Sequence, residues 1–178
     1  MKKFIFVLAC LLSVSLLFSG CMVSFRSNQS ASGSSDKNLT FCVTKEMQEK
    51  GITPENTESV KVLRDLIASN PKIGAENDFS ILYSGKQGDS NGQKFVTFFA
   101  VNKTDHALKN ISLKLTMKVG DDYVIKEQEV TLTEQSFGTI SSYTAMPVSI
   151  VLKDDSYTLL DKATNDNVSL SVTDFKSE

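Results

Sequence analysis

The sequence predicts a mostly β fold, an antiparallel β-sandwich with one N-terminal amphipathic helix packed on it. From residue 78 onward, apolar side chains recur at every second position in several short segments, which is the period of a half-buried strand. Loops rich in Gly, Asn, Asp and Lys separate these segments. Ahead of them, residues 54–69 repeat their apolar side chains with a helical period.

The helix expected at residues 54–69 has recognisable ends. Thr53 suits the N-cap position and Pro54 the first helical position, where a missing N–H does no harm. Pro71, directly after Asn70, ends the pattern because proline cannot continue the helical hydrogen bonds. An apolar stripe runs along the helix through Val60, Leu63 and Ile67.

Strands are expected on both sides of this helix. Residues 39–44 are a candidate short strand, and residues 79–84 alternate with a period of two. Residues 85–92 are rich in turn formers and predict a hairpin loop. Residues 95–101 are apolar on both faces, which is typical of a central strand covered twice.

The strand expected at residues 95–101 has a second apolar face, and the apolar stripe of the helix can pack on it. We expect the helix to lie over the face formed by Val96, Phe98 and Ala100. Phe95 and Phe99 then point into the interior of the sandwich. This arrangement would make residues 39–178 a single domain.

The clearest strand is residues 111–119, in which every second residue is apolar. Residues 123–132 predict another strand whose parity changes, so a bulge is expected near Lys126–Glu129. Two further strands and two polar loops complete the expected set: strands 144–152 and 168–172, and loops 153–156 and 161–167.

Six or seven short strands in roughly 100 residues are typical of an immunoglobulin-like β-sandwich. The chain has no Trp, so the Cys, Trp and Cys spacing of antibody domains is missing. The sequence therefore predicts an immunoglobulin-like sandwich of another kind.

The first 20 residues have the pattern of a secretory signal. Two lysines precede an apolar run that ends in Ser19 and Gly20. The run, residues 4–18, is shorter than the roughly 20 residues that span a bilayer, which favours a cleaved signal. An ordinary signal peptide without lipid and an uncleaved N-terminal anchor are the alternatives. All three place the rest of the chain outside the cytoplasmic membrane.

The stretch Phe18-Ser19-Gly20-Cys21 resembles a bacterial lipobox, although lipobox families usually have Leu where Phe18 stands. The resemblance implies cleavage between Gly20 and Cys21 and a lipid on the Cys21 thiol, which would attach the protein to the membrane. Residues 21–38 then form a Ser-rich flexible tether, since their composition cannot form a packed core.

Composition narrows the possible functions. The chain carries a net charge of −2, and removal of Lys2 and Lys3 with the signal lowers it to −4. An acidic chain without a basic patch is a poor nucleic-acid binder. Once Cys10 is cleaved off and Cys21 is lipidated, Cys42 has no partner for a disulfide and is expected to be a small buried side chain.

No catalytic pattern emerges from the sequence, and no cofactor or metal is expected. His106 follows Asp105, but adjacent residues seldom face one another and no nucleophile has a signature of its own. Lys114 and Lys118 project from the polar face of the strand at 111–119. They are candidates for contact with an anionic wall polymer, although a solvated face explains them equally simply.

The β region resembles a known type of bacterial surface domain. An apolar strand, the turn Asn102-Lys103-Thr104-Asp105 and an aliphatic strand follow one another as in immunoglobulin-like domains of exported lipoproteins. Phe137-Gly138-Thr139-Ile140 and Ala145-Met146-Pro147 resemble the later part of the SLAP domain, a family associated with accessory secretion and surface-layer assembly. Val148 stands where that family usually has an aromatic residue. The resemblance implies surface contacts and carries over no catalytic residue.

These observations predict a non-catalytic lipoprotein that binds an envelope protein or wall polymer, or has a structural role in the envelope. The alternative is an accessory subunit or small hydrolase acting on the envelope. An enzyme should show convergent ionisable groups in a cleft, whereas a binding module should show an exposed apolar or charged patch.

Overall fold

The computed structural model describes residues 37–90, 92–152, 154–164 and 166–178. The expected signal at 1–20, the lipidation site Cys21 and the tether up to residue 36 lie outside this range.

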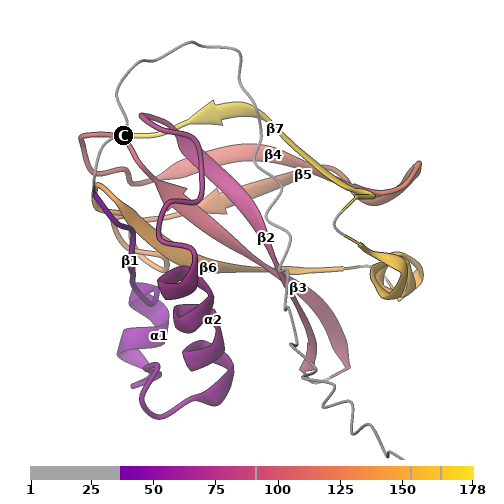
Figure 1. Ribbon diagram of the computed structural model, residues 1–178, viewed down its shortest axis with the longest axis horizontal. Coiled ribbons are helices and arrows are strands. Elements are labelled where there is room, and N and C mark those ends of the chain that lie inside the picture. Colours follow the sequence, from indigo (N-terminus) through magenta and orange to yellow (C-terminus); the bar gives the residue numbers. More distant parts are fainter. Residues whose placement is uncertain (1–36, 91, 153, 165) are drawn as a thin grey trace, which may run out of the picture.

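The described chain is mostly β and forms two sheets, as predicted (Figure 1). The first sheet has the strand order β1-β6-β3-β2 and the second the order β5-β4-β7. All neighbours are antiparallel except β1 and β6, which run parallel. The strands are β1 (Thr40–Phe41), β2 (Phe79–Ser90), β3 (Gln93–Asn102), β4 (Ile111–Val119), β5 (Asp122–Leu132), β6 (Thr144–Val151) and β7 (Val168–Lys176).

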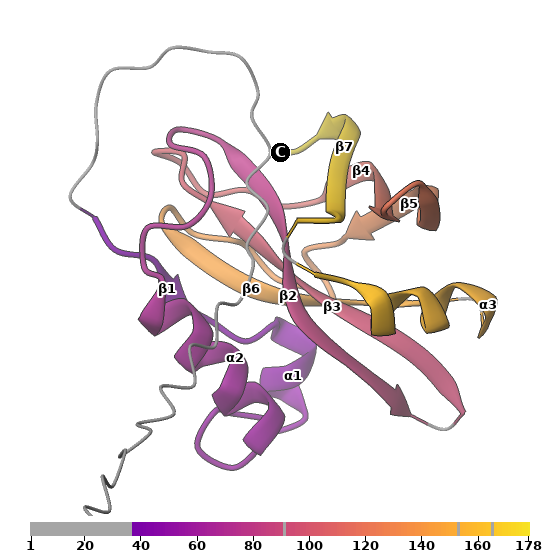
Figure 2. The same ribbon diagram turned by 45° about the vertical axis from the view of Figure 1, so that its right-hand side comes forward.

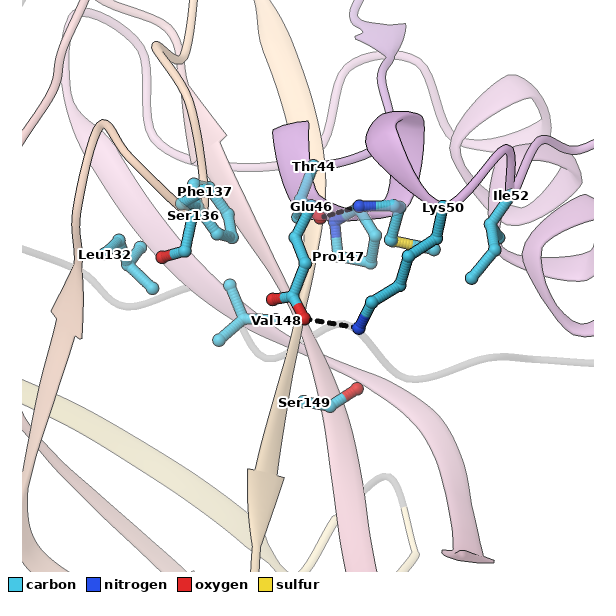
Figure 3. A pocket seen from close by; sticks show the side chains of 11 residues that line it. Thr44, Glu46, Lys50, Ile52, Leu132, Ser136, Phe137, Pro147, Val148 and Ser149 are labelled. Carbon is cyan, nitrogen blue, oxygen red and sulfur yellow. Dashed lines mark hydrogen bonds and ion pairs between the residues drawn. The ribbon is translucent and has the colours of Figure 1, made fainter.

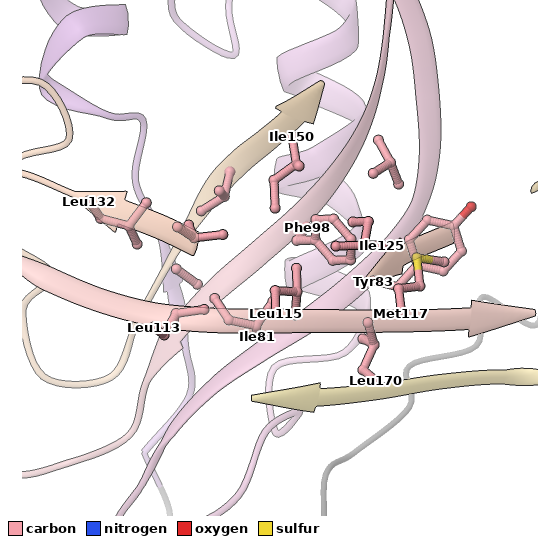
Figure 4. Close-up of a cluster of buried hydrophobic side chains, with 14 of the residues drawn as sticks. Ile81, Tyr83, Phe98, Leu113, Leu115, Met117, Ile125, Leu132, Ile150 and Leu170 are labelled. Atoms are coloured by element: carbon pink, nitrogen blue, oxygen red, sulfur yellow. The ribbon is translucent and has the colours of Figure 1, made fainter. Parts of the chain in front are cut away.

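The main core lies between the two sheets (Figure 4). Leu113, Leu115 and Met117 of β4 are buried and alternate with half-buried polar residues, which confirms the strict period of this strand. Facing them from the first sheet are Phe98 of β3 and Ile150 of β6. The two sheets therefore pack as the layers of a sandwich.

The helices are α1 (Lys45–Glu49), α2 (Glu58–Ser69) and α3 (Asp154–Tyr157), the last followed by a 3-10 turn over Thr158–Lys162. Figures 1 and 2 show α1 and α2 together on the side of the first sheet that faces away from β4, β5 and β7. α3 occupies most of the polar loop expected at 153–156, and the 3-10 turn includes the first two residues of the loop expected at 161–167.

Helix α2 covers the face of β3 opposite to the one expected. Leu63 and Ile67 cluster with Phe99 and Val101, whereas Phe98 lies in the core between the sheets. The alternation of β3 was read correctly, but both of its faces are apolar. The strand itself therefore did not indicate which face would receive the helix and which the second sheet.

The start of α2 also differs from the prediction. The helix begins at Glu58, and residues 53–57 form a turn in which Thr53 Oγ1 accepts a hydrogen bond from the Glu55 backbone N–H at 3.3 Å. The N-cap residue is Thr57, whose side chain makes no capping hydrogen bond. Pro54 thus stabilises the turn before the helix.

Two expectations about the β-strands have clear outcomes. The expected loop at 85–92 is mostly strand, because β2 continues to Ser90 and β3 starts at Gln93. Gly88 permits this, since a Cβ there would lie 2.5 Å from the ring of Phe95 on the paired strand. The bulge expected at 126–129 is confirmed by the register shift in β5 and by the positive φ of 46° at Glu127.

Candidate functional site

Helix α1 is docked by its first turn onto the chain that follows β5. The backbone N–H groups of Lys45 and Glu46 donate to the carbonyl oxygens of Phe137 and Ser136, at 3.0 and 2.9 Å. Thr44 caps the helix by accepting from the Met47 backbone N–H at 3.3 Å. These bonds satisfy first-turn donors that a five-residue helix could not satisfy by itself.

Three hollows surround α1, and we call them together the α1 cleft. The edge hollow, about 330 Å³, lies between α1, the end of β5 and β6. The sheet hollow, about 490 Å³, lies between α1, the first turns of α2 and the outer face of the first sheet. The loop hollow, about 290 Å³, lies beside Gly138 and Met146. Met47, Pro147 and Ser149 line both the edge and the sheet hollow, so the two adjoin at β6.

The edge hollow has walls on both sides of β6 (Figure 3). On one side are Leu132 and Phe137, both buried, and on the other are Met47 of α1 and Ile52. The Glu46–Lys50 ion pair, 2.5 Å between Oε1 and Nζ, crosses the opening. Both of its side chains are more than half exposed, so the pair contributes little stability.

Strand β6 has a free edge at the base of this cleft. β1 pairs only with Thr144 and Ala145, after which the chain turns away into α1. From Pro147 to Val151, β3 is the only strand among the described residues that pairs with β6. The Ser149 side chain is exposed and its Oγ lies 3.4 Å from Thr97 Oγ1.

The chemistry of the cleft suits binding. The side-chain oxygens of the edge hollow are already engaged: Thr44 caps α1, Ser136 Oγ pairs with Thr133 Oγ1 at 2.9 Å, and Glu46 pairs with Lys50. Burial raises the pKa of the Cys42 thiol beside the loop hollow, which disfavours its reactive thiolate form. In the described part of the chain, no group of three His, Cys, Asp or Glu residues is placed to hold a metal ion.

The two lysines predicted from sequence lie elsewhere, on the outer face of the second sheet. Lys114 Nζ is 2.7 Å from Asp174 Oδ2, and this hydrogen bond raises the pKa of Lys114 and lowers that of Asp174. Lys118 Nζ lies 4.3 Å from the centre of the Tyr123 ring, and Lys126 Nζ lies 5.1 Å from the same centre. Neither predicted lysine lines the α1 cleft, and each has a different partner.

The expectation that Asp105 and His106 would not face each other was wrong. Asp105 Oδ1 lies 2.9 Å from His106 Nδ1, and this hydrogen bond lowers the pKa of Asp105. The nearest hydroxyl along the chain, that of Thr104, is held by Asn102 Oδ1 and the His106 carbonyl. The pair stands in solvent, with 97% of the Asp105 side chain exposed, and lines none of the three hollows.

Sequence reasoning missed the α1 cleft, although it had two local signals. Thr44 ahead of Glu46 is a helix-start pattern, and Glu46 with Lys50 has the i, i+4 spacing of a helical ion pair. Phe137–Ile140 and Ala145–Pro147, which carry the resemblance to SLAP domains, supply residues to the cleft. The fold brings them together with α1, which lies about 90 residues earlier in the chain.

Gly20 and Cys21, the expected cleavage and lipidation residues, lie outside the described residues. Within the described ranges, no helix is both long enough and apolar enough to cross a membrane. Comparison with protein-family models, curated proteins and solved structures finds no match to the chain.

Proposed function

We propose that the chain is a lipoprotein held at the extracytoplasmic face of the cell membrane by a lipid on Cys21. Its β-sandwich is a non-catalytic binding module of the envelope. The Phe18-Ser19-Gly20-Cys21 stretch supports the anchor. The composition of residues 22–38 supports a tether that lets the sandwich stand off the bilayer.

The observation that carries the binding role is the α1 cleft. It combines half-buried apolar side chains, Met47 and Ile52, with the free edge of β6, and the side-chain oxygens of its edge hollow already have partners. A hydrolase acting on the envelope would need a nucleophile and base that point at a common substrate atom. The lining of the cleft suits recognition of a partner molecule.

The finer fold assignment belongs to the same proposal. The two packed sheets, in which neighbouring strands are mostly antiparallel, are compatible with an immunoglobulin-like sandwich of SLAP type. The segments that resemble that family converge on the α1 cleft, which supports a shared binding role for this end of the sandwich.

Replacement of the lipidated cysteine tests the anchor. We expect the Cys21→Ala protein to be released from the membrane fraction or to keep its signal peptide, because no thiol remains to accept lipid. Cys42→Ala is the matched control and should remain with the membrane, since Cys42 lies in the folded domain. Cell fractionation and the mass of the purified chain give the answer. A Cys21→Ala protein that stays membrane-bound with the wild-type mass would refute the lipid anchor.

A further inference from the structure

We propose that the free edge of β6 beside α1 receives an extended segment of a partner protein as an added β-strand. This inference rests on the proposed binding function and specifies the ligand as an extended peptide with apolar side chains at consecutive positions. Addition of a strand to an open sheet edge is a general mode of peptide recognition.

The β1 strand shows how this edge accepts a neighbour. The Thr40 backbone N–H donates to the Tyr143 carbonyl at 2.9 Å, and the Cys42 N–H donates to the Ala145 carbonyl at 3.0 Å. Backbone groups of alternate residues point to the same edge of a strand, so the next acceptor in this row is the Pro147 carbonyl. The chain leaves the row before reaching it, because Thr44 caps α1.

Beyond β1, the edge offers the groups that a new strand needs. Pro147 has no N–H, and it sits opposite Phe99 in the register of β3 and β6. Its carbonyl is an acceptor on the free side, and two residues later Ser149 presents both an N–H and a carbonyl there. The edge therefore has an acceptor followed by a donor and acceptor, in continuation of the parallel β1 ladder.

The hollows on the two sides of this edge determine the side chains of the guest strand. Successive side chains of a strand point to opposite faces. On the sandwich side, the edge hollow offers Leu132, Phe137 and Val148. On the outer side, the sheet hollow offers Val60 and Phe95. Because both hollows have apolar walls, apolar side chains suit consecutive positions of the guest strand.

The charges around the cleft favour a peptide over an anionic polymer. The charged residues lining the edge hollow are Glu46 and Lys50, which neutralise each other at 2.5 Å. Lys86 is the charged residue that lines the sheet hollow. Among the described residues, a polyanion would find two separate lysines, Lys86 in the sheet hollow and Lys45 in the loop hollow, whereas an extended peptide finds backbone partners and apolar surface.

A displayed library of random octapeptides, selected on the full chain purified in detergent, tests the proposal. We expect enriched peptides to share a short run of consecutive apolar residues. A synthetic enriched peptide should bind Met47→Glu and Ser149→Pro at least tenfold more weakly by fluorescence anisotropy. Phe175→Glu is the matched control, since Phe175 is an exposed apolar side chain on β7 that lines none of the three hollows, and its affinity should not change.

Hydrogen exchange supplies a readout specific to the edge. Peptide binding should slow exchange of the Ser149 amide at least tenfold, because that N–H gains an acceptor. Several results would overturn the inference: peptides without a run of consecutive apolar residues, equal affinity for all variants, or an unprotected Ser149 amide. Binding of purified anionic wall polymer in place of peptide, or a dimer that Met47→Glu dissociates, would overturn it too. Failure of the lipid anchor would appear separately, in the fractionation of Cys21→Ala.

Discussion

At the residue scale, Asn102 ties together three parts of the chain. It is fully buried at the end of β3, and its Nδ2 lies within hydrogen-bonding distance of the carbonyls of His106, Ile140 and Ser141, at 2.8, 2.9 and 3.2 Å. Its Oδ1 accepts from the backbone N–H and the hydroxyl of Thr104. The Asn-x-Thr turn recognised in the sequence is thus a structural clamp between the first turn after β3 and the segment before β6.

Replacing the amide of Asn102 tests the clamp. We expect Asn102→Asp to lower the free energy of unfolding by at least about 3 kcal/mol, because three carbonyls lose their donor and face a buried carboxylate instead. Asn56→Asp is the control. It removes one exposed hydrogen bond, from Asn56 Nδ2 to the Gly51 carbonyl, and should cost about 1 kcal/mol or less. Urea denaturation of both variants measures the difference, and equal losses would contradict the clamp.

Lys103, the next residue, anchors the segment between α2 and β2. Its side chain is completely buried, and its Nζ donates to Glu76 Oε1 at 2.5 Å and to the carbonyls of Lys72 and Gly74 at 3.1 and 3.4 Å. A buried ammonium needs such a full set of acceptors to offset its desolvation. No local pattern indicated this role, because a lysine in a turn is ordinarily exposed.

At the element scale, strand β4 shows what a regular alternation of apolar and polar residues can predict. Its strict alternation predicted the buried and half-buried faces correctly, because one face meets the core and the other meets water. The five-residue α1 has too few residues to show a period. Short helices of this kind depend on tertiary contacts, here the carbonyls of Ser136 and Phe137.

The two faces of β4 should respond very differently to truncation. Leu115→Ala should cost about 2–5 kcal/mol, because it leaves a cavity among fully buried neighbours. Lys114→Ala should change stability by no more than about 0.5 kcal/mol, since the Lys114–Asp174 pair is exposed. Thermal and chemical denaturation compare the two, and similar losses would mean that the parity of the strand is wrong.

At the scale of the whole molecule, α2 covers the outer face of the first sheet. Ile67 is 1% exposed, and it packs with Phe99 and Leu82, which are fully buried. Full burial of such a side chain is worth about 1.5–3 kcal/mol. The sheet is therefore apolar on both sides, with the second sheet on one and the helix on the other.

Removal of the N-terminal helices tests this second layer. A chain beginning at Asn77 should melt at a lower temperature than a chain beginning at Lys37 and should bind the dye ANS. The reason is that Leu82, Phe99 and Val101 lose their cover. Equal melting temperatures without dye binding would show that α2 adds nothing to the stability of the sandwich.

The sequence by itself determined the period and the two faces of β4, the two apolar faces of β3, the bulge in β5 and the existence of an apolar helical stripe. Those features depend on neighbours a few residues apart in the chain. The tertiary structure alone decided which face of β3 receives α2, where α1 docks and which edge of β6 stays open. Both faces of β3 are apolar, so its sequence does not show which face packs on α2 and which packs on the second sheet. The open edge exists because the chain leaves β6 at Thr44 to form α1, whose hydrogen-bond partners lie about 90 residues away.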